Sequence, residues 1–130
     1  MSATSLAFQT GGRICYRVDT SLSTDDYGDT IRNEVRTPTD AAESHVISSE
    51  IYGSKMHKPV IDIDVPIRVY PSSTLGHFHL YIDHEMTWWQ YRRLLRALVR
   101  AGLVEKGYAE VSGKRGGTHV RLPWVKKESA

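Results

Sequence analysis

The chain has 130 residues, of which 40% are hydrophobic, and this size and composition suit one modest globular domain. The lone Cys15 excludes an internal disulfide, no apolar run approaches the ~20 residues that span a bilayer, and the N-terminus lacks a signal-peptide pattern. Residues 1–65 carry 10 acidic and 6 basic residues, whereas residues 66–130 carry 5 and 11. We therefore expect a cytoplasmic protein with no membrane partner, whose basic second half either meets a polyanion such as nucleic acid or simply keeps the protein in solution.

The first forty residues predict little regular structure. Residues 1–12 are small and polar without a period, which predicts a flexible arm ahead of one domain over residues 13–127. Residues 14–18 are apolar enough for a short strand. The following run, residues 19–40, is rich in Ser, Thr, Asp and Asn and predicts a loop. Residues 39–52 suit either a short helix or a strand.

Two runs of alternating polarity follow, within residues 57–83. Asp62 and Asp64 alternate with isoleucine and valine, and His77 and His79 alternate with apolar residues of a second run. Such alternation predicts two strands, each with one apolar face and one face of metal-grade ligands. Pro66 interrupts the first strand, which residues 67–70 continue briefly, and Gly76 lies in the turn between the two runs.

Residues 87–102 predict the main helix. Thr87 and Gln90 have the spacing of a capping box, four apolar residues recur at helical spacing, and Gly102 suits the C-terminal stop. The opposite side carries a row of arginines, namely Arg92, Arg96 and Arg100. This row suits either a solvated helix face or contacts to phosphate groups.

A β-hairpin is the interpretation of residues 108–122. Two short apolar runs flank a glycine-rich turn that contains Lys114 and Arg115, which would reach phosphate from its tip. The whole pattern predicts an α+β domain in which an antiparallel or mixed sheet is packed by one main helix.

The two aspartates have the spacing of a metal site. Carboxylates at i and i+2 of a strand point the same way, and their oxygens suit Mg²⁺ or Mn²⁺. A pair of divalent ions held like this activates the attacking oxygen in polymerases and nucleases. The alternative is a half-exposed sheet whose aspartates form ion pairs with arginines.

Three short motifs resemble the archaeo-eukaryotic primase (primase-polymerase) superfamily. They are Asp62-Ile-Asp64, the segment from Ser73 to His79, and the Arg-Leu-Pro-Trp-Val-Lys segment, residues 121–126. The resemblance implies an RRM-like core, catalytic roles for Asp62, Asp64 and His79, and metal binding by the two aspartates. It also implies nucleotide or phosphate contacts, which fall on Ser73, His77, Arg121 and Lys126.

Other features of this resemblance stay open. Either His77 or His79 matches the family's histidine, and His79 is preferred. The family's third acidic residue corresponds to Glu110 or Asp83. Because the chain is short, the resemblance implies a minimal, accessory or inactive relative, of the kind that a bacteriophage would use in DNA replication.

A second resemblance is to winged-helix DNA-binding proteins. Residues 91–108 are similar to a recognition helix, and the basic turn is similar to the wing. A non-catalytic module of this kind would bind nucleic acid through Arg92, Arg96, Arg100, Lys114 and Arg115. The third hypothesis is a small protein-interaction module, so the residues alone leave open whether the chain is an enzyme.

Overall fold

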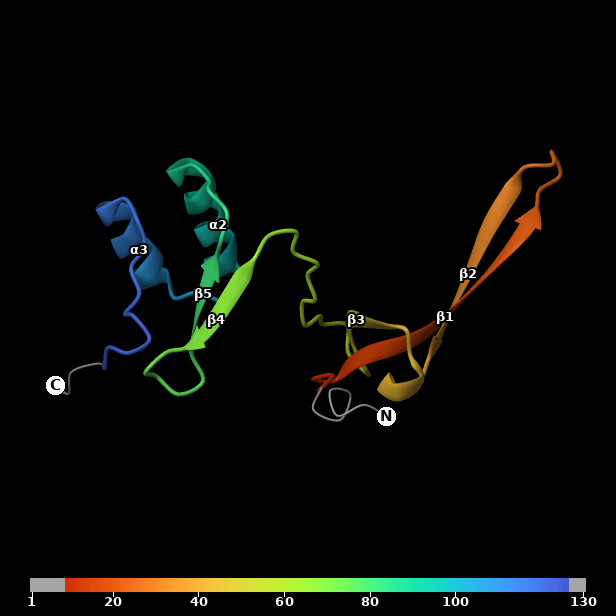
Figure 1. Cartoon of the computed structure of the whole chain (residues 1–130), viewed down its shortest axis with the longest axis horizontal. Coiled ribbons are helices and arrows are strands. Elements are labelled where there is room, and N and C mark those ends of the chain that lie inside the picture. The colour runs from red at the N-terminus through yellow and green to blue at the C-terminus, as the bar shows by residue number, and fades with distance from the viewer. Residues whose placement is uncertain (1–8, 127–130) are drawn as a thin grey trace. The chain divides into compact units, whose positions relative to one another are not determined.

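The structure of the chain is a computed structural model that describes residues 9–126. Its contacts divide into two compact units, Met1–Asp62 and Ile63–Ala130 (Figure 1). Antiparallel sheets and helices make up the regular structure, which confirms the predicted α+β class. That residues 13–127 act as a single domain stays a prediction. Of the predicted N-terminal arm, residues 1–8 lie outside the described residues, and Gly11 and Gly12 form a turn ahead of the first strand.

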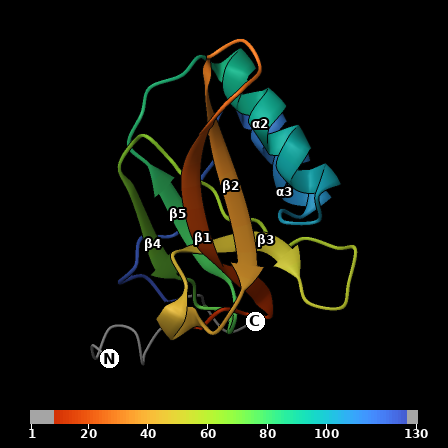
Figure 2. The ribbon, with the colours of Figure 1, turned by 90° about the vertical axis from the view of Figure 1, so that its right-hand side faces the viewer.

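The first unit is built on a three-stranded antiparallel sheet. Its strands are β1 (Arg13–Thr24), β2 (Thr30–Pro38) and β3 (Val46–Ile51), in the order β2-β1-β3. Figure 2 shows β1 and β2 as a long paired ribbon. Their register runs without a break from Tyr16 opposite Pro38 to Thr24 opposite Thr30.

The strand predicted at residues 14–18 is confirmed, but the loop predicted over residues 19–40 is wrong. Every residue of β2 is exposed, so the segment has no buried face and gives no apolar alternation. Backbone pairing holds the ribbon, and its threonines are β-branched residues that suit strands. The turn is organised by Asp25, whose Oδ1 accepts hydrogen bonds from the N–H groups of Tyr27 (2.9 Å) and Asp29 (2.8 Å).

For residues 39–52, the strand alternative is the correct one. Only Ala41–Glu43 are helical, as a single 3-10 turn. The β-branched residues that follow this turn in the sequence form β3. β3 lies antiparallel to β1, with Cys15 opposite Ile47. Cys15 is the buried apolar residue of this unit among the residues described, at 7% exposure.

The second unit contains the hairpin β4 (Ile67–Pro71) and β5 (Phe78–Ile82), followed by α2 (Trp88–Arg100) and α3 (Lys106–Arg115). The second predicted strand is confirmed as β5. The first is wrong over residues 58–66, which are outside any strand, whereas its brief continuation over residues 67–70 is confirmed by β4. Pro59 and Pro66 flank that run and lack the N–H that a strand ladder needs. Pairing begins only beyond Pro66, whose carbonyl accepts from the N–H of Asp83 (2.9 Å).

Helix α2 confirms the predicted helix at both ends. Thr87 Oγ1 accepts from the N–H of Gln90 (3.1 Å), and the Gln90 side chain accepts from the N–H of Thr87 (2.9 Å), so the capping box is complete. Gly102 follows the helix with φ 78°, a conformation that glycine adopts without strain. Leu95 is the buried residue of α2, at 5% exposure.

The hairpin predicted over residues 108–122 is wrong, since the chain there forms α3. Gly116 has φ 75° and caps the helix, with its N–H donating to the carbonyl of Ser112 (3.0 Å). The same glycines that suit a hairpin turn therefore act as a helix C-cap. Lys114 and Arg115 belong to the last helical turn, so the winged-helix wing is absent from the described residues 106–126. In the part of the chain that the structure describes, no helix is long and apolar enough to cross a membrane.

Candidate functional site

Helices α2 and α3 lie beside each other (Figure 1). A groove lined mainly by cationic and apolar residues runs along them. It has a volume of about 720 Å³. Its floor consists of small and aliphatic residues, namely Leu95, Val99, Ala109 and Gly113. Around them stand one acidic and five basic side chains, which are Glu110, Arg92, Arg96, Arg100, Lys106 and Lys114. We call this feature the α2–α3 groove.

Helical spacing explains why these residues meet. Arg92, Arg96 and Arg100 follow one another at four-residue steps, so they form one row along α2. On α3, Ala109 and Gly113 have the same spacing and offer almost no side chain. The Arg92 guanidinium occupies this space, because a Cβ added to Gly113 would lie 3.7 Å from its Nη2 atom.

The positive charge of the groove is mostly uncompensated. Lys106 and Glu110 form a long ion pair of 3.7 Å between exposed side chains. No other ion pair involves a groove residue among residues 9–126. The α2 sequence contains no carboxylate at all. Glu110 is the one acidic side chain in the lining, and the four cations other than Lys106 have no ion-pair partner among the described residues.

The groove gathers most of the residues predicted to bind nucleic acid. Arg92, Arg96, Arg100 and Lys114 line it, whereas Arg115 does not. Lys106 also lines the groove, and the sequence interpretation missed it because residues around 108 were assigned to a strand. The i, i+4 spacing of Lys106 and Glu110, which suits an ion pair on a helix, is the sequence signal that could have indicated α3.

The structure does not place the residues predicted for a metal site on two neighbouring strands. Asp62 and Asp64 are both exposed and lie in the strandless segment, and the boundary between the two units falls between them. His79 is half-buried in β5, opposite Tyr70. The prediction that the aspartates occupy a strand next to the histidine strand is therefore wrong. Among residues 9–126, no group of three or more His, Cys, Asp or Glu side chains is arranged to hold a metal ion.

The remaining predicted contacts are distributed over exposed segments. Ser73 and His77 belong to the β4–β5 turn, where the His77 N–H donates to the carbonyl of Thr74 (3.0 Å). Arg121 and Lys126 are exposed in the segment after α3. The catalytic, metal-binding and nucleotide-binding roles of these residues stay predictions. Of the two candidates for a third acidic residue, Asp83 follows β5 directly and Glu110 lies in the α2–α3 groove.

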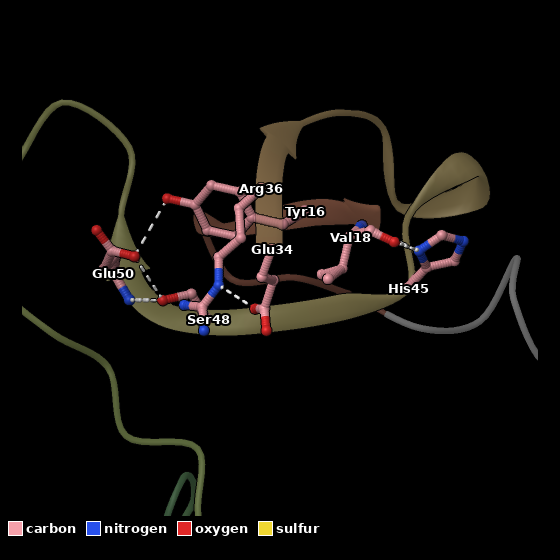
Figure 3. Close-up of polar contacts among 7 residues, drawn as sticks. All are labelled: Tyr16, Val18, Glu34, Arg36, His45, Ser48 and Glu50. Carbon is pink, nitrogen blue, oxygen red and sulfur yellow. Dashed lines mark hydrogen bonds and ion pairs between the residues drawn. The ribbon is translucent and has the colours of Figure 1, made fainter. Parts of the chain in front are cut away.

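The sheet of the first unit carries a polar cluster that the sequence did not reveal (Figure 3). The Tyr16 hydroxyl donates to Glu50 Oε1 (3.1 Å), which also accepts from the Ser48 hydroxyl (2.9 Å). Arg36 Nε donates to Glu34 Oε1 (2.9 Å). Partial burial, followed by the hydrogen bond to Glu50, raises the pKa of Tyr16 above its ordinary value. The bond with Glu34 raises the pKa of Arg36.

His45 completes this sheet directly before β3 begins. Its Nδ1 lies 3.0 Å from the Val18 nitrogen and 3.1 Å from the Val18 oxygen (Figure 3). The paired register of β1 with β3 ends at Tyr16 opposite Val46, so the imidazole replaces the next backbone partner. The polar groups of this sheet therefore bond mainly to one another. They support the sheet and leave the α2–α3 groove as the candidate site.

Comparison of the chain with protein-family models, with curated proteins and with solved structures finds no match.

Proposed function

We propose that the chain is a non-catalytic nucleic-acid-binding module that holds a phosphate backbone in the α2–α3 groove. The observation that carries this proposal is the set of four cations, Arg92, Arg96, Arg100 and Lys114, that line one groove without an ion pair among the described residues. A phosphate chain supplies the missing counter-charge at several positions at once. Each contact would release a condensed counterion, and this release is the main source of affinity in such complexes.

The shape of the groove favours a linear polyanion over a single small anion. The three arginines of α2 rise about 6 Å at each step along the helix axis, so their guanidinium groups form an extended row. Each guanidinium can donate two parallel hydrogen bonds to one phosphate. Lys114 lines the same groove from α3, so that cations from both helices face a bound strand.

The apolar floor strengthens this electrostatic effect. Leu95 and Val99 lie beneath the charged row, and a low-dielectric wall focuses the field of neighbouring charges of one sign. Exposed arginines are ordinarily explained as a solvated helix surface. That explanation does not account for Lys106 and Lys114, which line the same α2–α3 groove from a second helix.

The test is a titration of fluorescently labelled DNA and RNA, single-stranded and duplex, followed by anisotropy across a salt series. We expect the logarithm of the association constant to fall linearly with the logarithm of salt, with a slope of about −2 to −4 for four or fewer phosphate contacts. A chelator should leave binding unchanged. This separates the proposal from the metal-dependent primase-polymerase function, which requires Asp62 and Asp64 to hold divalent ions.

Two arginine variants sharpen the experiment. Arg96→Ala should weaken binding to every sequence and reduce the salt slope by about one. Arg93→Ala is the matched control, because Arg93 is an exposed arginine of the same helix that does not line the groove. Equal losses for the two variants would contradict the proposal, as would binding that is insensitive to salt or lost with chelator.

A further inference from the structure

The β4–β5 hairpin exposes an apolar face that no element of its own unit covers. The strands pair with Ile67 opposite Ile82, Val69 opposite Leu80 and Pro71 opposite Phe78. These six residues alternate with the rest of each strand, so they share one side of the hairpin. All six are exposed, and Phe78 reaches 64%, Leu80 55% and Val69 54%. We call this surface the hairpin apolar face.

The opposite side of the same hairpin is the better covered one. His79 and Tyr81 are half-buried, and the rings of Tyr70 and Tyr81 meet edge to face at 5.6 Å. On that side the cover is confined to the two β5 residues, since Arg68 and Tyr70 of β4 are exposed, whereas the apolar face is exposed on both strands. A lone two-stranded hairpin is marginal in water, and a hydrophobic face needs a further layer to become stable.

We propose that the hairpin apolar face binds the same face of a second copy of this chain, giving a homodimer. None of its six residues is ionisable, so two copies can approach without bringing like charges together. The Val69–Leu80 pair lies in the middle of the three pairs. A two-fold axis that runs parallel to the strands over this pair would place each of the three pairs against its equivalent. Stacking two hairpins face to face gives each the second layer that a single hairpin lacks.

The available area fits a weak dimer. An aromatic side chain buries roughly 150–250 Å². With each aliphatic side chain near the lower end of that range, the exposed fractions of Ile67, Val69, Phe78, Leu80 and Ile82 correspond to roughly 450 Å² per copy. A standard stable interface buries about 800 Å² per partner. The face supplies somewhat more than half of that from side chains alone, and Pro71 and the strand edges add to it. We therefore expect a dimer that is weaker than one with an interface of standard size.

The experiment is sedimentation of the full chain over a concentration series, in buffer without nucleic acid. We expect a reversible monomer–dimer equilibrium. Leu80→Asp places a charge at the centre of the face and should raise the dissociation constant more than about tenfold. Leu103→Asp is the matched control, because Leu103 is 66% exposed between α2 and α3 and lies outside the hairpin; it should leave the equilibrium unchanged.

A gentler variant guards against loss of the hairpin itself. Val69→Thr keeps the β-branched shape and the strand preference while it adds a polar hydroxyl to the face. We expect a dissociation constant several times larger than that of the parent, with an unchanged circular dichroism spectrum. A parent chain that stays monomeric at the highest concentration overturns the proposal. So does a dimer that survives both hairpin substitutions, or one that Leu103→Asp disrupts to the same extent.

Discussion

The β1–β2–β3 sheet of the first unit and helix α2 of the second unit differ in how their charged residues are partnered. In the first unit, Glu34 bonds to Arg36 and Glu50 accepts from Tyr16, so carboxylates find partners within the same sheet. In the second unit, Arg92, Arg96 and Arg100 form no ion pair with the described residues. In the first unit these polar side chains already have hydrogen-bond partners within the sheet. The second unit leaves a row of cations without ion-pair partners among the described residues, and the proposed function rests on this row.

Local geometry explains the difference. Residues i and i+2 of a strand share a face, so Glu34 and Arg36 are neighbours as soon as β2 forms. In a helix the neighbours are three and four residues apart, and α2 offers only arginines and apolar residues at those steps from Arg96. The sheet thus pairs these charges locally, whereas the arginines of α2 have no carboxylate within their own helix.

The largest effect should come from the floor of the groove. Leu95→Ala removes the buried apolar residue of α2 and should lower the free energy of unfolding by about 2–5 kcal/mol, through lost apolar burial and the cavity that remains. Chemical unfolding followed by circular dichroism measures it. Leu103→Ala, at an exposed position, should change stability by no more than about 0.5 kcal/mol. Similar losses for both variants would show that the second unit does not depend on this one buried contact.

Two glycine substitutions with a smaller effect distinguish helix α3 from the hairpin that the sequence predicts at this place. Gly113 lies inside the helix, and an added Cβ meets only Arg92 at an ordinary 3.7 Å. Gly113→Ala should therefore stabilise the chain by about 0.5–1 kcal/mol, because alanine loses less conformational freedom in a helix. Gly116→Ala should destabilise it by about 1 kcal/mol, since Gly116 has φ 75°. Thermal unfolding compares the two, and a hairpin at this place would not give the two substitutions opposite signs.

The smallest effect concerns the polar cluster of the first unit and depends on pH. Burial and the bond to Glu50 raise the pKa of Tyr16, so the folded state holds the phenol proton more tightly than the unfolded chain does. This contribution is fully present below the unfolded-state pKa of about 10 and is lost as pH rises through the higher folded-state pKa. Stability should consequently fall less steeply above pH ~10 in Tyr16→Phe than in the parent.

Denaturant unfolding at several alkaline pH values tests this dependence. Glu50→Gln should give an intermediate slope, because it removes the negative charge but leaves the burial that is the larger cause of the shift. A parent and a Tyr16→Phe variant with identical alkaline slopes would show that the cluster does not contribute to the stability of the first unit.

Sequence reasoning succeeded where the signal was local. The main helix, its capping box at Thr87 and its stop at Gly102 are confirmed, and so are the strands around Ile14 and His79. It was wrong where one residue type suits two structures. The glycines near Lys114 fit a hairpin turn as well as a helix C-cap, and the Ser- and Thr-rich run before Pro38 fits a loop as well as an exposed strand.

The sequence by itself determined the row of arginines on α2, because helical spacing places residues four apart on one face whatever the surroundings. It did not determine that α3 adds Lys106 and Lys114 to the same groove, since this requires the packing of two helices. Nor did it determine that the aliphatic side of the β4–β5 hairpin stays exposed. Alternation specifies which residues share a face, but only the tertiary structure decides which face is covered, because burial depends on segments remote in the chain.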